Sequence, residues 1–492
     1  MSDSQFKGFR SWFFPFHFNE CKTLLSMGAM IFLILFNYTI LRNLKDALII
    51  NAPFSDAEVV SYLKLWAITP SAILFIFFYS SLANAFQRER VFNYCMLPFV
   101  AFFAFFTFVL YPNIDTLHPS QDLASQMIEA YPRLKWFIVI WANWTFSLFY
   151  VFAEMWGSVV LSLLFWQFAN ASIRREAAKR FYPFFGFLGN FGLTLAGQFV
   201  GFFSKPINGY AWESALFILM TIVLINAALI GIFHFLASRQ HEVLSLKKKK
   251  QKSSFKESIA HIFSSKHLAF IAFIVFAYGI SINLLDVLWK GQVKAYFAGD
   301  PAAYSAYMGQ FSSLTGLVAM PLMLLGGQIL RRMSWFSSAL IPLVILLITG
   351  LGFFAVLLIG RYFLPGGFFF YGMEYSFLAL AVHIGLWQSI FSKASKYSLF
   401  DSTKEMAYMP LDEELKSKGK AAVDVVGGRC GKSGGSLLVI SLQLLFPGMT
   451  LPALSPIIAV FFVLVLVGWF YSLYGLSDTL NSCESQTTKQ AA

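Results

Sequence analysis

Ionisable side chains interrupt several long apolar stretches of this chain of 492 residues. A charged group inside a bilayer costs roughly 2.5–3.5 kcal/mol on insertion scales, so it marks a candidate functional site. Bases exceed acids in these stretches, and surplus positive charge favours a polyanion such as a phosphate compound. The bases are Arg42, Lys45, Lys64, Lys290, Arg429 and Lys432, and the acids are Asp46, Glu154, Asp286 and Asp424.

Helical spacing offers a simpler explanation for some of these charges. Arg42 and Asp46 are four residues apart, as are Asp286 and Lys290, so each pair can form within one helix and only lower the cost of insertion. Asn283 lies on the same side as the second pair. The residues that lack an opposite charge four positions away, and for which a functional role is favoured, are Lys45, Glu154 and Lys432.

The cost of burying an unpaired charge applies most strongly to Lys432. It stands about eleven residues, roughly 16 Å, into its predicted span, near the middle of a bilayer core about 30 Å thick. The nearest acid on its helical stripe is Asp424, two turns away. The sequence therefore predicts an unpaired ammonium there, whose partner is an anionic substrate.

Two glycine-rich segments need a separate interpretation. The segment 427–435 is not a P-loop, because three residues separate Gly427 from Gly431, where a P-loop has four. In a helix its glycines form a stripe beside Lys432 that a ligand or a neighbouring helix can approach. The fifth predicted span carries a similar face at Gly186, Gly189, Gly192, Gly197 and Gly201, for which helix packing is the favoured interpretation.

Composition excludes a soluble enzyme. The chain is 58% hydrophobic, 18% aromatic and 13% charged, with a mean hydropathy of +0.65, whereas soluble domains carry about 25% charge. The four cysteines form no CxxC pair and no cluster with histidine. No Ser/His/Asp or Cys/His set suggests covalent catalysis, so we expect neither an enzyme nor a metal or other cofactor.

Twelve membrane-spanning helices are predicted. The fourth is expected to be one long helix that runs on into the cytoplasm. The spans lie near 23–46, 59–84, 91–111, 135–170, 181–203, 213–237, 267–291, 303–330, 336–359, 370–394, 421–446 and 453–475.

The net charge of +12 is distributed as in a membrane protein and does not indicate nucleic-acid binding. If the amino terminus is cytoplasmic, basic residues gather in every cytoplasmic loop, including the run 247–250, and are few in outer loops. Both termini are then cytoplasmic. No signal peptide is evident, and about 22 residues before the first span leave little room for an organelle transit peptide, so we expect a bacterial inner membrane.

A repeat divides the chain into halves. Tyr, Ile, Asn, Leu, Asp and Leu recur in register between 38–48 and 278–288, so span one matches span seven. This predicts an all-α membrane protein with a major-facilitator-like arrangement of two six-helix halves and a substrate site between them. The expected parts are an amino-terminal segment 1–22, a first half 23–237, a basic linker 238–266, a second half 267–475 and a tail 476–492.

Several motifs together resemble one transporter family. LRNLKDAL at 41–48 is similar to the first-helix motif of the ATP/ADP translocases of chlamydiae, rickettsiae and plastids. The block 396–424, GKSGG at 431–435, AEMWGS at 153–158 and YGISIN at 278–283 look like that family's signatures. The resemblance covers about 20–475. It implies a carrier that in most members exchanges external ATP for internal ADP.

The resemblance also implies which residues serve transport. The family's charged transport residues fall on Lys45, Glu154 and Lys432, and a fourth, usually Glu, falls on Asp286. We expect Lys45 and Lys432 to hold phosphates with help from Arg42, and Asn283 to contact phosphate or ribose. Glu154 and Asp286 are expected to tune the local charge.

Three functions remain open from the sequence. The first is an antiporter for ATP and ADP that works by alternating access, in the bilayer and as a monomer. The second, suggested by Asp at 286, is a proton-coupled net importer of nucleoside triphosphates of broader base specificity. The third is a membrane enzyme that acts on lipid phosphate, because it too needs buried bases.

Overall fold

The computed structural model describes residues 20–173, 175–205, 211–240, 265–364, 367–370, 373–409, 411, 423 and 428–491. The amino-terminal segment, most of the linker 238–266 and Asp424 lie outside these residues, and the side chain of Arg429 is likewise not described. Apolar runs of span length become helices because a helix satisfies its own backbone hydrogen bonds, as a bilayer requires.

The elements of the amino-terminal half are helical. They are α2 (Cys21–Ile50), α3 (Val59–Tyr62), η2 (Leu63–Ile68), α4 (Thr69–Ala85), α5 (Arg88–Phe105), η3 (Phe106–Leu110), η4 (Tyr111–Asn113), α6 (Ile114–Leu117), α7 (Gln121–Ala130), η5 (Pro132–Leu134), α8 (Lys135–Ala142), α9 (Trp144–Trp156), η6 (Gly157–Phe165), α10 (Trp166–Ser172), α11 (Arg175–Phe203) and α12 (Trp212–Gln240).

The carboxy-terminal half adds one small antiparallel hairpin, in which Phe369 pairs with Glu374. Its elements are α14 (Lys266–Tyr296), α15 (Pro301–Arg332), α16 (Trp335–Leu358), η8 (Ile359–Phe363), β1 (Phe368–Phe370), β2 (Met373–Tyr375), α17 (Phe377–Ser395), η9 (Lys396–Phe400), α18 (Asp401–Ala407), α20 (Gly428–Leu445) and α21 (Leu451–Ala491).

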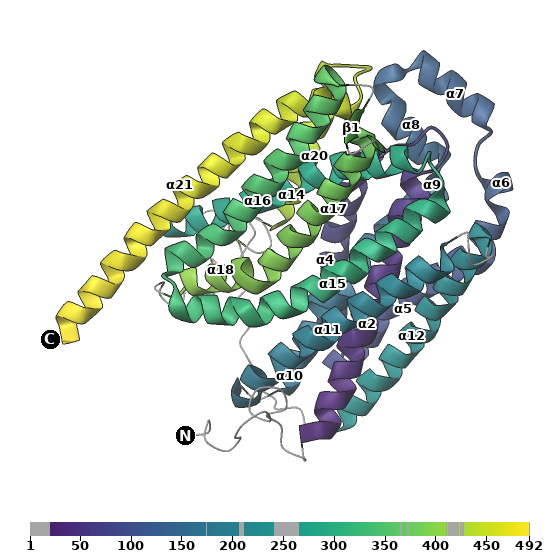
Figure 1. Ribbon diagram of the computed structural model, residues 1–492. Helices are drawn as coiled ribbons and strands as arrows, with labels where there is room; N and C mark the ends of the chain where they lie inside the picture. The colour runs from purple at the N-terminus through teal and green to yellow at the C-terminus, as the bar shows by residue number, and fades with distance from the viewer. Residues whose placement is uncertain are drawn as a thin grey trace.

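The number of spans agrees with the prediction. Within the described residues, eleven helical segments are long and apolar enough to cross a membrane. The remaining predicted span, 421–446, is α20, whose beginning borders residues that are not described. The start of α2 and the end of α21 lie toward the same end of the bundle (Figure 1), as an even number of spans requires.

The fourth predicted span is not a single helix, so the prediction of one helix over 135–170 was wrong. Asn143 adopts φ −112° and ψ 42° and separates α8 from α9. Its amide nitrogen donates to the carbonyl oxygen of Pro53, 3.1 Å away, in the connection between α2 and α3. The span proper begins at Trp144 and ends at Asn170. A side-chain amide that bonds the backbone competes with helical continuation.

The two halves meet along helices with small residues. A Cβ atom added to Gly197 of α11 would lie 2.4 Å from the backbone nitrogen of Ser313 of α15, so only glycine permits this approach. The glycine face of the fifth predicted span is therefore a helix-packing surface, as expected. On α20, a Cβ atom at Gly431 would lie 2.8 Å from the carbonyl oxygen of Phe276, so the neighbour of that stripe is α14.

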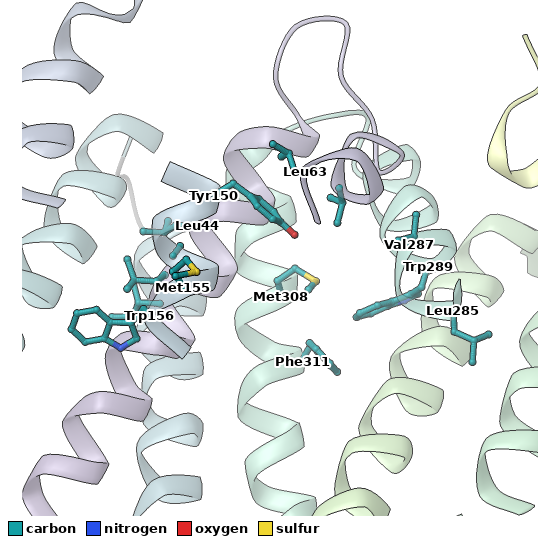
Figure 2. Packing of buried hydrophobic residues seen from close by; sticks show 14 of the residues in the cluster. Leu44, Leu63, Tyr150, Met155, Trp156, Leu285, Val287, Trp289, Met308 and Phe311 are labelled. Atoms are coloured by element: carbon teal, nitrogen blue, oxygen red, sulfur yellow. The ribbon is translucent and has the colours of Figure 1, made fainter. Parts of the chain in front are cut away.

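Large buried side chains fill the space between these helices (Figure 2). Phe311 on α15 packs edge-on against Trp289 on α14, with ring centroids 4.9 Å apart. Trp156 on α9 donates from its indole nitrogen to the carbonyl oxygen of Ile34, 3.3 Å away. These contacts fix the helices that carry the charged residues described next, because closely packed side chains leave little freedom for a helix to rotate.

Candidate transport site

The charged residues predicted from separate spans lie together where the halves meet. We call this group the charged cluster, and it comprises Arg42, Lys45, Asp46, Lys64, Glu154, Asp286, Lys290, Lys393 and Lys432. The first half supplies α2, η2 and α9, and the second supplies α14, α17 and α20.

Lys290 of α14 joins the two carboxylates that the repeat relates. Its Nζ atom lies 2.7 Å from Asp286 of the same helix and 3.0 Å from Asp46 of α2. The contact of Asp286 with Lys290 that helical spacing allows is present, but Lys290 also contacts the other half. Because the side chains of Lys290 and Asp46 are almost fully buried, this ion pair between the halves is shielded from solvent and salt.

Lys45 has three neighbours. Its Nζ atom lies 2.9 Å from Asp46 and 3.4 Å from Glu154, and it also lies 3.8 Å from the ring centroid of Tyr150. The sequence indicated no helical partner for Lys45, and its strongest partners are indeed the adjacent residue and another helix. This lysine is therefore a buried, compensated charge.

Lys432 differs from the expectation of an unpaired buried ammonium. Its side chain is 65% exposed, and its Nζ atom lies 4.0 Å from Glu154. The prediction failed because a partner on another helix is invisible to helical spacing, and because depth in a span does not imply burial. Glu154 thus approaches Lys45 of its own half with Oε2 and Lys432 of the other half with Oε1.

Asn283 of α14 is placed by hydrogen bonds to residues of η2 and α20. Its Oδ1 atom accepts from Lys64 at 2.5 Å, and its Nδ2 atom donates to Ser436 of α20 at 3.1 Å. Within the described residues the hydrogen-bond partner of Lys64 is this amide, and no carboxylate lies within 4 Å of it. Lys64 therefore contributes to the cluster a positive charge that no carboxylate within 4 Å compensates.

Arg42 does not pair with Asp46, so the alternative of an internal pair on α2 was wrong for these residues. Its Nη2 atom donates to Ser312 of α15 at 3.1 Å, and its Cζ atom lies 5.9 Å from the rings of Tyr38 and Phe311. Asp46 instead forms ion pairs with Lys45 and Lys290.

Sequence reasoning selected six candidate residues and missed others in the same cluster. Lys64 and Lys290 were recognised as charges in spans but were not selected. Lys393 was overlooked because it stands at the end of the predicted span 370–394, where a lysine usually faces the headgroups. In the structure its Nζ atom lies 4.2 Å from the ring centroid of Phe311.

The described part of the cluster carries a surplus of positive charge. Its six cations, Arg42, Lys45, Lys64, Lys290, Lys393 and Lys432, outnumber the three carboxylates of Asp46, Glu154 and Asp286, so the difference is +3. Among the described residues no group of three or more His, Cys, Asp or Glu side chains could hold a metal ion.

Paired helical halves with an ionic site between them define a secondary transporter. Solved transporters share this fold. A bacterial homologue of the iron transporter ferroportin matches with a TM-score of 0.60 at 14% identity, over 94% of this chain and all of its own. A D-xylose–proton symporter matches with a TM-score of 0.55 at 10% identity, over 92% of this chain and 96% of its own.

Sequence comparison then gives the family. The family model described as TLC ATP/ADP transporter matches residues 1–479, and the chain belongs to this family. ADP,ATP carrier protein 1 of Rickettsia bellii (strain RML369-C) is 38% identical over 99% of both chains. That of Chlamydia muridarum (strain MoPn / Nigg) is 41% identical over all of this chain and 94% of its own.

A plastid relative extends the comparison. The plastidic ATP/ADP-transporter of Solanum tuberosum is 42% identical over 91% of this chain and 71% of its own. The chain is thus a multi-pass membrane transporter of ATP and ADP and not an enzyme, as the sequence predicted.

Proposed function

We propose that this carrier exchanges ATP for ADP by alternating access and binds their phosphates at the charged cluster. The observation that carries the proposal is the surplus of three positive charges at the junction of the halves. Cations there are costly unless an anion compensates them. A nucleotide polyphosphate supplies that compensation and touches both halves at once.

Within the cluster, Glu154 indicates where a phosphate group binds. Its two oxygens lie 3.4 Å from Lys45 and 4.0 Å from Lys432, which belong to opposite halves. A phosphate oxygen is a stronger acceptor for the same two lysines. We assign Lys45 and Lys432 to phosphate binding and Arg42 to a neighbouring oxygen, with Glu154 holding the lysines in place in the empty carrier.

Asn283 and Asp286 complete the proposed site. Asn283 is held by Lys64 and Ser436, so binding of its amide to phosphate or ribose exchanges one of these bonds for another. Asp286 orients Lys290 through their 2.7 Å contact, which makes it a positioning residue in this assignment. We further place the carrier in a bacterial inner membrane as a monomer.

Obligatory exchange follows from the electrostatics of the empty cluster. Reorientation has to break the contacts of Lys290 with Asp46 and of Lys432 with Glu154, because each joins opposite halves. Of these two contacts, the pair of Lys290 and Asp46 is buried, and breaking a buried ion pair leaves an uncompensated charge that costs about 3–5 kcal/mol. A bound polyanion offsets this cost in both directions, so the loaded carrier reorients faster than the empty one.

The test is uptake of labelled nucleotide into liposomes that contain the purified carrier. Exchange predicts rapid uptake of ATP only when ADP or ATP is inside, and no net uptake into empty liposomes under an imposed proton gradient. Uptake into empty liposomes driven by that gradient would instead identify a proton-coupled importer. GTP, CTP and UTP in the same assay define base specificity.

A further inference from the structure

Two cations of the charged cluster face the same aromatic ring. Lys393 Nζ lies 4.2 Å from the ring centroid of Phe311, and Arg42 Cζ lies 5.9 Å from it. Arg42 comes from α2 in the first half, whereas Lys393 and Phe311 come from α17 and α15 in the second. Two cations from opposite halves thus share one aromatic neighbour at the junction of the halves.

Among the described residues, no carboxylate compensates these two charges, unlike those of Lys45 and Lys290. In the part of the chain that the structure describes, no carboxylate lies within 4 Å of Arg42 or Lys393, whereas Lys45 and Lys290 each contact two. A ring face attracts a cation much less strongly than a carboxylate does. Arginine also keeps its proton under all ordinary conditions, so its charge is available to an anionic ligand.

Arg42 has hydrogen-bonding capacity to spare. A guanidinium carries five N–H donors in a planar fork, and its side-chain partner among the described residues is Ser312, at 3.1 Å. Ser312 lies 3.2 Å from Asn43 Oδ1, an acceptor. The fork is therefore anchored on one side and suited to a tetrahedral anion on the other.

We propose that Arg42 and Lys393 bind the γ-phosphate of ATP and thereby distinguish ATP from ADP. The inference rests on the proposed function, because it assigns one group of the same nucleotide to named side chains. Arg42 lies one turn from Lys45 on α2, about 4.5 Å along the helix axis. One phosphate chain can therefore run from Lys45 and Lys432 to Arg42 and Lys393.

This assignment gives the two cation groups different tasks. Lys45 and Lys432 meet the phosphates that ATP and ADP share. Arg42 and Lys393 meet the group that only ATP possesses, and they join α2 to α17 through it. Binding of ATP then compensates more of the surplus charge than binding of ADP does.

The experiment measures dissociation constants of ATP, ADP and AMP for the purified full-length carrier and for Arg42→Gln and Lys393→Gln. Loss of one charge-assisted hydrogen bond is expected to weaken ATP binding about 10- to 100-fold. ADP and AMP binding should change less than about 3-fold, so the ratio of ATP to ADP affinity falls. Arg42→Lys keeps the charge and should retain most of that ratio.

Two further variants serve as controls. Arg361→Gln removes an exposed cation outside the cluster and should leave all three constants unchanged. Lys290→Gln removes a cation that contacts two carboxylates, so it should lower the melting temperature of the empty carrier. Arg42→Gln and Lys393→Gln should leave that temperature equal or raise it, because they remove uncompensated charge.

Three results would overturn the proposal. One is an equal loss of affinity for ATP, ADP and AMP, which shows that these cations attract every nucleotide by their charge and do not contact the γ-phosphate specifically. Another is unchanged ATP binding in both glutamine variants. The third is that both variants fail to fold or melt earlier, which shows that these cations are structural. Failure of the wild-type carrier to bind any nucleotide refutes the proposed function itself. Measuring the wild-type carrier first therefore separates this outcome from failure of the γ-phosphate assignment.

Discussion

Glu58 links the two halves at the end of the bundle opposite the start of α2, and it predicts a pH dependence of transport. It precedes the span 59–85, and its side chain is buried. Its Oε1 atom accepts a hydrogen bond from the backbone nitrogen of Leu451, 3.3 Å away, at the start of α21. The first N–H groups of a helix lack partners within the helix, so Glu58 caps a helix of the opposite half.

Burial, helped by the nearby charge of Asp56, raises the pKa of Glu58 from 4.5 to about 7, although Lys135 and the N–H of Leu451 oppose the shift. Lys294 of the second half engages Asp56 at 3.8 Å. When the halves separate at this end, Glu58 becomes solvated and its pKa returns toward its ordinary value. The proton is then released.

The direction and magnitude of the pH effect on closure follow from the linkage between proton binding and conformation. Below about pH 4.5 Glu58 is neutral in both conformations, and the closed contact has its full stability. As the pH rises toward 7, the separated form loses its proton first, so closure becomes less favourable. A difference of about 2.5 pKa units corresponds to about 3 kcal/mol at 1.36 kcal/mol per unit. Acid therefore favours closure of this end.

The assay compares the pH profile of ATP/ADP exchange, from pH 5 to 8, in wild type and in Glu58→Gln. The amide still accepts from Leu451 but cannot ionise, so the variant should keep the behaviour of wild type at low pH and show a flatter profile. Glu129→Gln, which changes an exposed carboxylate of α7, controls for the titration of ATP itself. Parallel profiles of wild type and Glu58→Gln would refute the reasoning.

Three other substitutions test the packing and the charges. Lys290→Gln should destabilise the carrier by about 3–5 kcal/mol, because two carboxylates lose their bridge, and Asp286→Asn in the same chain should restore part of the loss in a melting experiment. Lys432→Ala should abolish the nucleotide-dependent thermal shift without lowering the melting temperature of the empty protein, because its side chain is 65% exposed; a variant that fails to fold would contradict this. Gly197→Ala should lower the melting temperature, because the added Cβ atom overpacks against Ser313. Gly231→Ala is the control and should not lower it, because a Cβ atom there meets no atom within 4 Å.

Much of the fold could be predicted because each span is a local property of the sequence. Hydropathy identified the helices, and the repeat related Asp46 to Asp286, which the structure joins through Lys290. The break at Asn143 was missed because one amide in an apolar run carries no periodic signal. Its cause is a hydrogen bond to Pro53, which is far away in sequence.

The pairing of charges could be predicted only within one helix. Asp286 and Lys290 satisfied that condition, and their predicted contact is present. For Asp46 the same rule suggested Arg42, but two lysines hold it instead, one of them from the other half. Spacing reports which residues share a face, whereas the choice of partner depends on how the helices pack.

The distribution of partners explains why the acids in the cluster matter to a carrier of anions. If the cluster held only cations, a polyphosphate would bind too tightly to leave. Asp46, Glu154 and Asp286 instead compensate Lys45 and Lys290 and hold Lys432 nearby. When the nucleotide departs, these carboxylates contact the lysines again. The departing phosphates are thus replaced by carboxylates of the protein, and the lysines are not left uncompensated. Rapid release and strong attraction can then coexist, because the cost of exposing bare cations is removed in both steps.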